Sequence, residues 1–322
     1  MNYRSVADMN ELILRNLDQI PADVDLVVGV PRSGLLAATL ISLYLNRPLT
    51  DVQGLGENRL LGKGKRAIPG YDEASIQDAR KILVVDDCIS LGTEIRRTKQ
   101  IIDRLGFANR TVYLAVFSFP ENPHLADFTL QVVPRPMCFQ WSFMHTPELK
   151  GYCLDIDGLL CREAGLEQDD GGIDDEDFLS DATPLFLPTA EVGWLVTSRL
   201  EKHREATEAW LARHRVRYRE LVMLDVPSHE ILNEALHVDF KASAYRRSGA
   251  SLLIENSPVL AQRIAAKTGL PVMCMTSNRM IANQDVERWV GRINHFKKLL
   301  RRLRRAPRSL FNRLRPHQRT IS

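Results

Sequence analysis

The sequence contains no apolar run near the roughly 20 residues that a helix needs to cross a bilayer. Cysteine is also scarce: the five cysteines are odd in number and scattered, which argues against a disulfide framework or a cysteine-rich metal site. The chain begins with a mixed polar and apolar pattern and lacks the apolar core of a signal peptide. We therefore expect a cytoplasmic protein with reduced thiols.

Acidic residues are absent from the last part of the chain. Residues 292–322 contain eleven Lys or Arg and no Asp or Glu. The rest of the chain has 32 basic against 40 acidic side chains, a net charge of −8. The overall charge of +3 is therefore the sum of an acidic body and a strongly basic tail.

Alternating strand and helix patterns predict an α/β protein with two domains, for which 322 residues are sufficient. Strand-like apolar runs lie within 25–34 and at 81–86, 111–118, 128–133, 153–155, 193–197, 221–224, 251–255 and 271–275. Helical patterns include 35–45, 94–105, 202–214 and 258–268, and the glycine-rich basic stretch 53–70 is predicted to be a mobile loop. We expect mainly parallel sheets in domains 1–150 and 151–285, followed by a basic amphipathic segment, 286–322.

Two carboxylates and a small-residue turn follow the strand pattern at 81–86. Asp86 and Asp87 are placed to accept hydrogen bonds from sugar hydroxyls, and the following turn opens a helix. The N–H groups of such a turn and helix start suit a phosphomonoester, to which Ser90 and Thr93 add hydroxyl donors. The earlier turn Pro31-Arg32-Ser33-Gly34 offers a second anion site with a guanidinium. The turn at 31–34 alone fits an ordinary strand–helix connection, but the two turns together favour a phosphorylated sugar.

This half of the chain resembles the type I phosphoribosyltransferases, specifically their orotate-like branch. The 5-phosphate loop of that family is matched by 85–87 and 90–93, its pyrophosphate loop by 29–34, and its basic catalytic loop by the stretch around Lys63, Lys65 and Arg66. The resemblance implies that the domain binds phosphoribosyl pyrophosphate (PRPP) with Mg²⁺. It assigns PRPP binding to Arg32, Ser33, Gly34, Lys63, Lys65, Asp86, Asp87, Ser90, Leu91, Gly92, Thr93 and Glu94.

The residues bear on the acceptor in two ways. Purine-type members of that family have an acid where Ser90 stands here, and its absence argues against a purine acceptor. The aromatic segment 139–145 matches no nucleobase pocket, and both a hydrophobic cover over the sheet edge and an acceptor-binding role fit it.

A second strand–acid motif begins at Asp155-Ile156-Asp157-Gly158. Thr197 follows the apolar run at 193–197, Lys241 lies farther on, and Glu255 ends the run at 251–255. Together these match the four motifs of the haloacid dehalogenase-like phosphatases over about residues 151–280, with Glu255 where the family more often has Asp.

That resemblance assigns a role to each of these residues. Asp155 is the nucleophile that forms an aspartyl-phosphate, and Asp157 is the general acid and base. Thr197 and Lys241 hold the phosphoryl oxygens, while Mg²⁺ is held by Asp155, the backbone carbonyl of Asp157, and Glu255. The insert 159–191 is too short for a large cap domain, which favours an open site.

The combination of both domains resembles the dual-domain ribofuranosyltransferases of bacterial surface-polysaccharide assembly. The resemblance implies transfer of 5-phosphoribosyl from PRPP to a hydroxyl of a lipid-linked glycan, and then removal of the 5-phosphate to leave ribofuranose. One alternative is a nucleobase phosphoribosyltransferase coupled to a nucleotide phosphatase. Another is a PRPP-sensing regulator that binds nucleic acid. Asp87, Glu94 and His145 are all candidates for the base that deprotonates the acceptor.

The basic tail has apolar residues at helical spacing from 286 onward, separated by Lys and Arg. Such a helix suits an anionic membrane surface, at the inner face of the cell membrane, and it equally suits packing on the second domain with a solvated basic face. Nucleic acid is not the expected partner, because base-stacking aromatics are sparse in this segment.

If the tail binds membrane, deleting residues 292–322 will release the protein from anionic liposomes without changing its activity on a soluble acceptor. Each basic residue near an anionic surface contributes about 1 kcal/mol of attraction, which salt screens. Co-sedimentation of the full-length and truncated proteins at low and high salt measures this effect. Equal sedimentation of the two forms would assign the tail to packing on the body.

Overall fold

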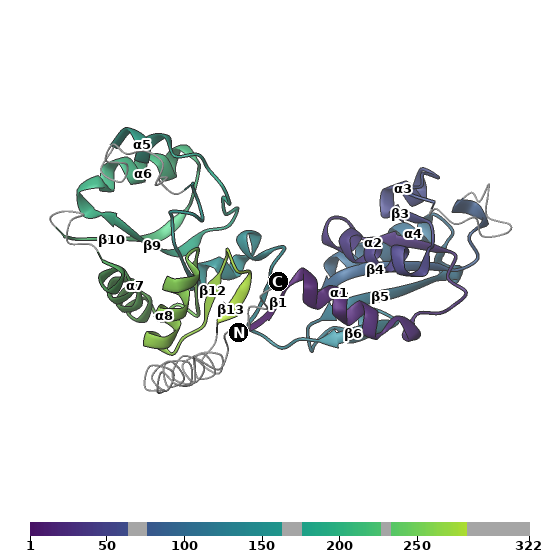
Figure 1. Cartoon of the computed structure of the whole chain (residues 1–322). Coiled ribbons are helices and arrows are strands. Elements are labelled where there is room, and N and C mark those ends of the chain that lie inside the picture. The colour runs from purple at the N-terminus through teal and green to yellow at the C-terminus, as the bar shows by residue number, and fades with distance from the viewer. Residues whose placement is uncertain (64–75, 163–175, 227–232, 282–322) are drawn as a thin grey trace, which may run out of the picture. The chain divides into compact units, whose positions relative to one another are not determined.

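A computed structural model of the chain describes residues 1–63, 76–162, 176–226 and 233–281 (Figure 1). The chain divides into two compact units, Met1–Phe143 and Met144–Ser322. The predicted basic tail lies outside the described residues, as do Lys65 and Arg66 of the predicted catalytic loop.

The first unit is built on a five-stranded sheet in the order β3-β2-β4-β5-β6, in which every neighbouring pair is parallel. Its strands are β2 (Leu26–Gly29), β3 (Leu49–Asp51), β4 (Ile82–Ile89), β5 (Thr111–Ser118) and β6 (Phe128–Val132). Its helices are α1 (Val6–Arg15), α2 (Ser33–Leu45), α3 (Val52–Gly56) and α4 (Thr93–Arg104). The predicted α/β class with a parallel sheet is therefore confirmed for this unit.

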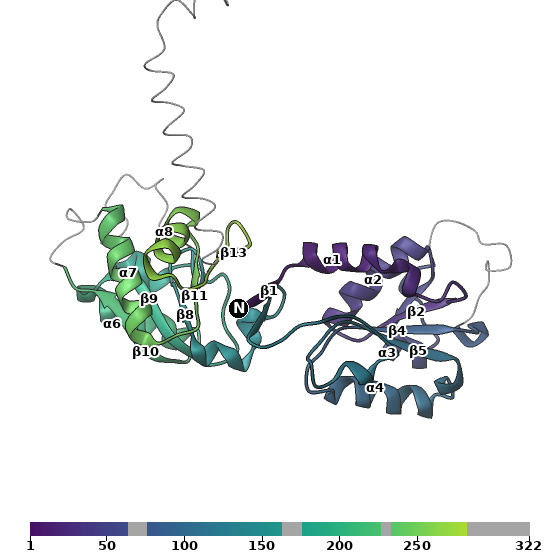
Figure 2. The ribbon, with the colours of Figure 1, turned by 90° about the horizontal axis from the view of Figure 1, so that it is seen from below.

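The helices of the first unit cover both faces of the sheet, and α1 and α2 lie on the opposite side from α4 (Figure 2). Alternate residues of one strand enter different cores, because successive side chains of a strand point to opposite faces. Leu83 and Val85 pack with residues of α1 and α2, whereas Ile82 and Val84 pack with residues of α3 and α4. Burial on both faces explains why β4 reads as a continuous apolar run before its two acids.

A separate two-stranded parallel sheet joins the start of the chain to the end of the first unit. It pairs β1 (Asn2–Arg4) with β7 (Met137–Phe139), placing Arg4 opposite Phe139. Immediately after β1, Ser5 caps α1: its side chain accepts from the N–H of Asp8, and the Asp8 carboxylate accepts from the N–H of Ser5. This reciprocal cap fixes where α1 begins.

The second unit has a six-stranded sheet in the order β10-β9-β8-β11-β12-β13, parallel except for β12 and β13. Its strands are β8 (Tyr152–Leu154), β9 (Val192–Leu200), β10 (Tyr218–Leu224), β11 (Leu252–Glu255), β12 (Val272–Cys274) and β13 (Arg279–Ile281). Its helices are α5 (Glu176–Asp181), α6 (Arg204–Arg213), α7 (Glu234–Ser248) and α8 (Pro258–Thr268). Residues of α7 and α8 pack on one face of this sheet, and α5 and α6 lie on the other side (Figure 1).

Short 3₁₀ turns complete both units. They span Leu17–Gln19, Ile76–Asp78, Ala108–Arg110, Pro123–Leu125, Phe143–His145, Pro147–Gly151 and Glu201–His203. None of the described helices is long and apolar enough to cross a membrane.

Three elements differ from the sequence prediction. The strand that carries Asp86 and Asp87 does not end at the acids but continues to Ile89, where β5 still pairs with it. Likewise β9 continues through Thr197 to Leu200 and is followed by a 3₁₀ turn before α6. The stretch predicted as a loop from residue 53 falls partly in α3, which Asp51 caps by accepting from the N–H of Gly54. In all three cases, pairing with neighbours or a cap overrides the local sequence pattern.

We predict that Gly29→Ala destabilises the first unit. A Cβ at this position would lie 2.5 Å from the Cα of Leu35, so α2 would have to move away from β2. Forced overpacking of this kind costs about 1–3 kcal/mol, which lowers the melting temperature by several degrees. Gly62→Ala is the matched control, because nothing lies within 4 Å of the added Cβ. Equal melting temperatures for the two variants would contradict the close contact.

Candidate active sites

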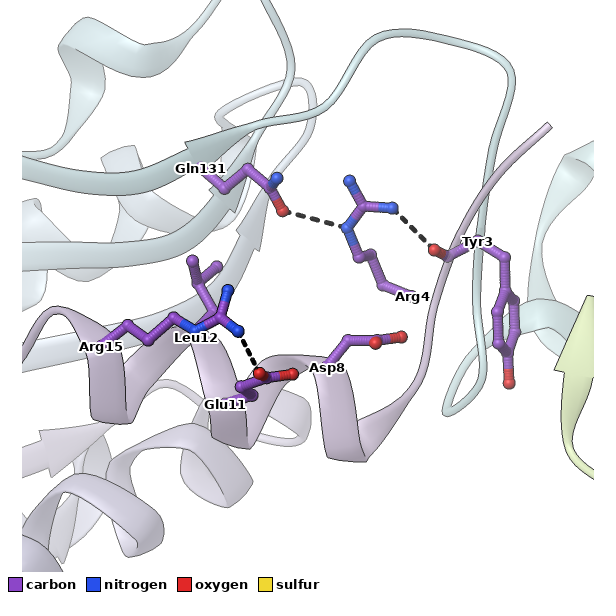
Figure 3. A pocket seen from close by; sticks show the side chains of 7 residues that line it. All are labelled: Tyr3, Arg4, Asp8, Glu11, Leu12, Arg15 and Gln131. Carbon is purple, nitrogen blue, oxygen red and sulfur yellow. Dashed lines mark hydrogen bonds and ion pairs between the residues drawn. The ribbon is translucent and has the colours of Figure 1, made fainter.

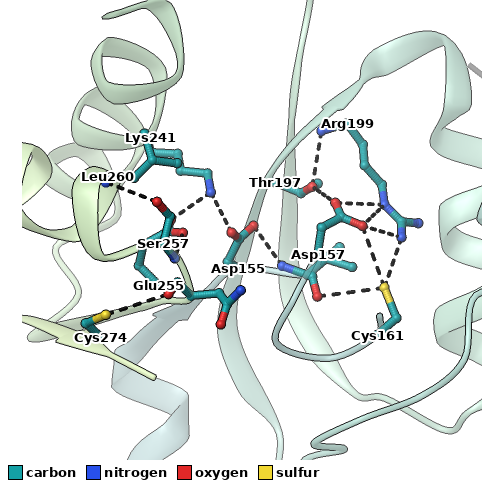
Figure 4. Close-up of polar contacts among 12 residues, drawn as sticks. Asp155, Asp157, Cys161, Thr197, Arg199, Lys241, Glu255, Ser257, Leu260 and Cys274 are labelled. Carbon is teal, nitrogen blue, oxygen red and sulfur yellow. Dashed lines mark hydrogen bonds and ion pairs between the residues drawn. The ribbon is translucent and has the colours of Figure 1, made fainter. Parts of the chain in front are cut away.

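In the second unit, three charged side chains from three elements meet in the interior (Figure 4). Asp155 follows β8 directly, Lys241 lies on α7, and Glu255 ends β11. The ammonium Nζ of Lys241 donates to Asp155 Oδ2 at 2.6 Å and to Glu255 Oε2 at 2.7 Å. All three side chains are almost completely buried. The structure thus brings together three of the residues predicted for a phosphatase site.

The electrostatics of this triad follow from its surplus of negative charge. Burial raises the pKa of Asp155 well above its usual range, and Lys241 opposes that rise. Burial acts to lower the pKa of Lys241, but the two carboxylates outweigh it, so the pKa of Lys241 is raised. The main cause thus differs between the two groups: burial for Asp155, and the two neighbouring carboxylates for Lys241. The remaining oxygens are also held: Asp155 Oδ1 accepts from the N–H of Ile156, and Glu255 Oε1 from the N–H of Ser257.

Asp157 lies beside this triad but is held by a different partner. Its Oδ2 accepts from the hydroxyl of Thr197 at 3.1 Å, and Arg199 donates to both of its oxygens, with Nη2 2.7 Å from Oδ1. Thr197 is fully buried and also accepts from the N–H of Arg199. Thr197 therefore contacts the predicted general acid in this structure.

Arg199 was not among the predicted site residues. Its side chain is only 1% exposed, and besides Asp157 it contacts Cys161, whose pKa burial and Asp157 raise to about 12. In the sequence Arg199 lies just after the predicted run at 193–197, and its burial follows from the continuation of β9 to Leu200. A buried arginine requires a charged partner. The sequence could not identify that partner.

The turn after Asp157 depends on Gly158. This residue has a φ of +72°, and a Cβ there would lie 2.2 Å from the side-chain nitrogen of Asn256. Asn256 is held in turn by the hydroxyl of Thr276, which donates to its amide oxygen at 2.8 Å. Only glycine combines this backbone conformation with so close a neighbour.

The donor set in the second unit fits a hard divalent cation. Asp155 and Glu255 supply carboxylate oxygens in a buried position, where they share the single ammonium of Lys241. Carboxylate oxygens are hard donors of the kind that Mg²⁺ prefers. Among the residues that the structure describes, no three His, Cys, Asp or Glu side chains gather as a metal site. The predicted set contains only two such side chains, because its third ligand is a backbone carbonyl.

In the first unit, Asp86 and Asp87 lie next to each other near the end of β4, and each is 7% exposed. Burial, and then the charge of Asp87, raise the pKa of Asp86 well above its usual range. Asp87 Oδ2 accepts a hydrogen bond of 2.6 Å from the indole Nε1 of Trp141. The aromatic segment whose role the sequence left open therefore contacts one of the predicted sugar-binding acids.

The two predicted anion-binding turns lie at helix starts. Gly92 precedes α4 with a φ of +78°, and the carbonyls of Ser90 and Leu91 accept from Asn122 and Arg96. Thr93 and Glu94 form the first turn of α4 and are exposed. In the other turn, the exposed Arg32 precedes α2, and Ser33 and Gly34 begin it. The Pro31–Arg32 peptide is cis.

Two other predicted residues lie apart from these turns. Lys63 is exposed and outside any strand or helix, whereas Lys65 lies outside the described residues. His145, one of the candidate bases, belongs to the second unit, where its Nδ1 lies 3.2 Å from the hydroxyl of Thr189.

A further pocket of about 210 Å³ lies in the first unit between β1, α1 and β6 (Figure 3). Arg4 donates there to the side chain of Gln131 at 3.0 Å and to the carbonyl of Tyr3, and Arg15 pairs with Glu11. It contains no predicted site residue, and its arginines are engaged by neighbouring protein groups, so we assign it no ligand.

Comparison with known proteins gives matches among solved structures alone: no family model matches the chain, and no curated protein does. Purine phosphoribosyltransferase from Pyrococcus horikoshii is 16% identical, with a TM-score of 0.32, over 43% of this chain and 92% of its own. Xanthine-guanine-hypoxanthine phosphoribosyltransferase from Helicobacter pylori is 17% identical, with a TM-score of 0.33, over 44% and 92%. Orotate phosphoribosyltransferase from Aeropyrum pernix is 20% identical, with a TM-score of 0.28, over 39% and 71%.

We predict that Lys241→Met strongly destabilises the second unit. The change leaves Asp155 and Glu255 buried without their shared cation, and breaking a buried ion pair in this way costs about 3–5 kcal/mol. Urea unfolding followed by circular dichroism measures the loss. Lys150→Met is the control: its side chain is 66% exposed and pairs with Glu191 at 3.6 Å, so a loss under about 1 kcal/mol is expected. Similar losses in both variants would show that the triad is not a structural centre.

Proposed function

We propose that the chain is a bifunctional ribofuranosyltransferase. Its first unit transfers 5-phosphoribosyl from PRPP to a glycan hydroxyl, and its second unit removes the 5-phosphate to leave a β-ribofuranose residue in a surface polysaccharide, either O-antigen or capsule. One observation carries the proposal: each unit has buried acids near the carboxyl end of a strand that lies between two parallel neighbours. Asp86 and Asp87 lie on β4 between β2 and β5, and Asp155 follows β8 between β9 and β11.

The carboxyl ends of parallel strands are where α/β proteins bind ligands, because the helix starts there offer N–H groups to anions. In the first unit, Asp86 and Asp87 lie on the strand that leads to the turn before α4. The acids suit the ribose hydroxyls, and the turn suits the 5-phosphate. A sugar phosphate would thus span groups that β4 and the following turn present together.

In the transfer step, the acceptor oxygen bonds to C1 of PRPP while the bond from C1 to pyrophosphate breaks. Pyrophosphate leaves with the bonding electrons, and the acceptor proton passes to a base. Charge develops on the ribose ring as that bond weakens, as in other glycosyl transfers, and nearby carboxylates stabilise it. Displacement at the α-configured carbon gives the β-linked product.

In the hydrolytic step, a carboxylate oxygen of Asp155 attacks phosphorus while the bond from phosphorus to the sugar O5 breaks. Asp157 gives its proton to that leaving oxygen, and then takes a proton from the water that releases phosphate from Asp155. Lys241, 2.6 Å from Asp155, favours the ionised nucleophile and offsets the charge of the phosphoryl group. Asp155, Glu255 and the carbonyl of Asp157 would hold Mg²⁺, which supplies further charge neutralisation.

The proposed acceptor is a lipid-linked glycan, and the proposed location is the cytoplasm, at the inner face of the cell membrane. Two features of the sequence support this: the basic tail suits an anionic surface, and Ser90 replaces the acid of purine-type enzymes. A nucleobase acceptor remains the second candidate, and the experiment below distinguishes the two.

Crossed variants test the division of labour. Pyrophosphate release from PRPP is first screened with panels of glycans and nucleobases, and the products are then identified by mass spectrometry. We expect Asp155→Asn to transfer normally and to accumulate an acceptor that carries a phosphorylated pentose. The double change Asp86→Ala and Asp87→Ala will abolish transfer, and this variant will still hydrolyse a pre-made phosphoribosylated glycan.

Asp181→Asn is the control for the second unit, because this side chain is 79% exposed and pairs with Arg213 on the surface. It should behave as the wild type in both steps. A dephosphorylated product formed at the normal rate by Asp155→Asn would overturn the nucleophile assignment, and turnover with nucleobases alone would replace the glycan acceptor.

A further inference from the structure

The strongest unexplained contact in the first unit joins Trp141 to Asp87, residues 54 positions apart in the sequence. The indole N–H donates to Asp87 Oδ2 at 2.6 Å. Asp87 is buried and Trp141 is partly buried. Hydrogen bonds to an ionised acceptor are about twice as strong as those between neutral groups. This contact therefore restricts the orientation of one of the two acids proposed to bind the ribose.

Stacked rings fix the plane of the indole. Trp141 stacks on Phe139, with ring centroids 4.7 Å apart and an interplanar angle of 16°, and on Phe117, at 6.1 Å and 27°. Phe117 belongs to β5 and pairs with Cys88 of β4, the residue after Asp87. The ring is thus held against the strand that carries the acids.

The backbone around Trp141 is also anchored, by the start of the chain. Phe139 pairs with Arg4 in the β1–β7 sheet, the N–H of Gln140 donates to the carbonyl of Arg4 at 3.0 Å, and the Gln140 side chain accepts from the N–H of Val6 at 2.7 Å. A donor held by backbone pairing, a side-chain bond and ring stacking loses little freedom when it binds its acceptor. Such support is what a preorganised site requires.

Because Trp141 donates to Asp87, the two neighbouring acids have different surroundings. Burial, and then the neighbouring Asp87, raise the pKa of Asp86, whereas the Asp87 carboxylate accepts the indole N–H of Trp141. Trp141 engages Oδ2 of Asp87, and the side chains of Asp86 and Asp87 also contact each other. An Asp87 held in one orientation therefore constrains its neighbour Asp86 as well.

We propose that Trp141 is a positioning residue for PRPP binding, which orients the Asp87 carboxylate toward the ribose hydroxyls through its indole N–H. The inference rests on the proposed function, because it takes PRPP as the ligand of the first unit. It also gives the aromatic segment a third role, distinct from a cover over the sheet and from a direct contact with the acceptor.

The test measures the affinity of the full-length protein for PRPP, with Mg²⁺ present, by isothermal titration calorimetry. Trp141→Phe keeps an aromatic ring and removes the N–H, and we expect it to weaken binding about tenfold or more, as loss of a hydrogen bond to a charged group does. Trp194→Phe is the matched control, because Trp194 donates in the same way to Glu220 at 3.0 Å in the second unit. This control should bind PRPP within about twofold of the wild type.

A double-mutant cycle separates positioning from packing. In an Asp87→Asn background, Trp141→Phe should cause no comparable further loss of PRPP affinity, because the carboxylate that Trp141 orients is gone.

A rescue variant gives a second test. Trp141→His restores a ring N–H and should recover part of the PRPP affinity that Trp141→Phe loses, which a packing role alone does not explain. Melting temperatures of all variants identify any that fail to fold, and in that case Trp141→His and Asp87→Asn carry the comparison.

The outcomes are distinct. Wild-type affinity in Trp141→Phe overturns the inference, and so does an equal loss in both backgrounds, which would assign Trp141 to packing. Failure of the wild-type protein to bind PRPP overturns the proposed function itself, and the role of Trp141 falls with it.

Discussion

Parallel strand pairing is the constraint on which both candidate sites depend. When neighbouring strands run in the same direction, their carboxyl ends share one edge, and the residues that follow them meet there although they are far apart in sequence. Asp155 and Glu255, which end adjacent strands, are brought together in this way, and α7 adds Lys241. The strand order of each unit therefore determines which side chains meet at its candidate site, and the local sequence supplies those side chains.

Buried charge imposes a second requirement. The second unit places two cations beside three carboxylates: Lys241 contacts Asp155 and Glu255, and Arg199 contacts Asp157. Removing an ion from water is costly unless partners replace its hydration, so each charge fixes the position of another. The same contacts that keep the interior stable thereby hold a nucleophile candidate and an acid candidate in separate environments, which is how one site gives two carboxyl groups different tasks.

Much of this architecture could be predicted from sequence, because strands buried on both faces appear as apolar runs and helices show their own period. The runs at 111–118 and 258–268 coincide with β5 and α8. Strand ends were less predictable: β4 and β9 continue past their polar residues because neighbouring strands still pair with them. The partners of Arg199 and Trp141 could not be predicted, since contacts across 42 and 54 residues depend on the folded chain.

The pairing of β1 with β7 has a consequence for synthesis of the chain. Residues 2–4 have their strand partner at residues 137–139, so β1 can pair only after nearly the whole first unit has been synthesised. Contacts of such long sequence separation form late and slow folding. Until then, β1 exposes an unpaired edge, and the support beneath Trp141 is incomplete. The complete fold of the first unit is therefore reached only after translation has entered the second.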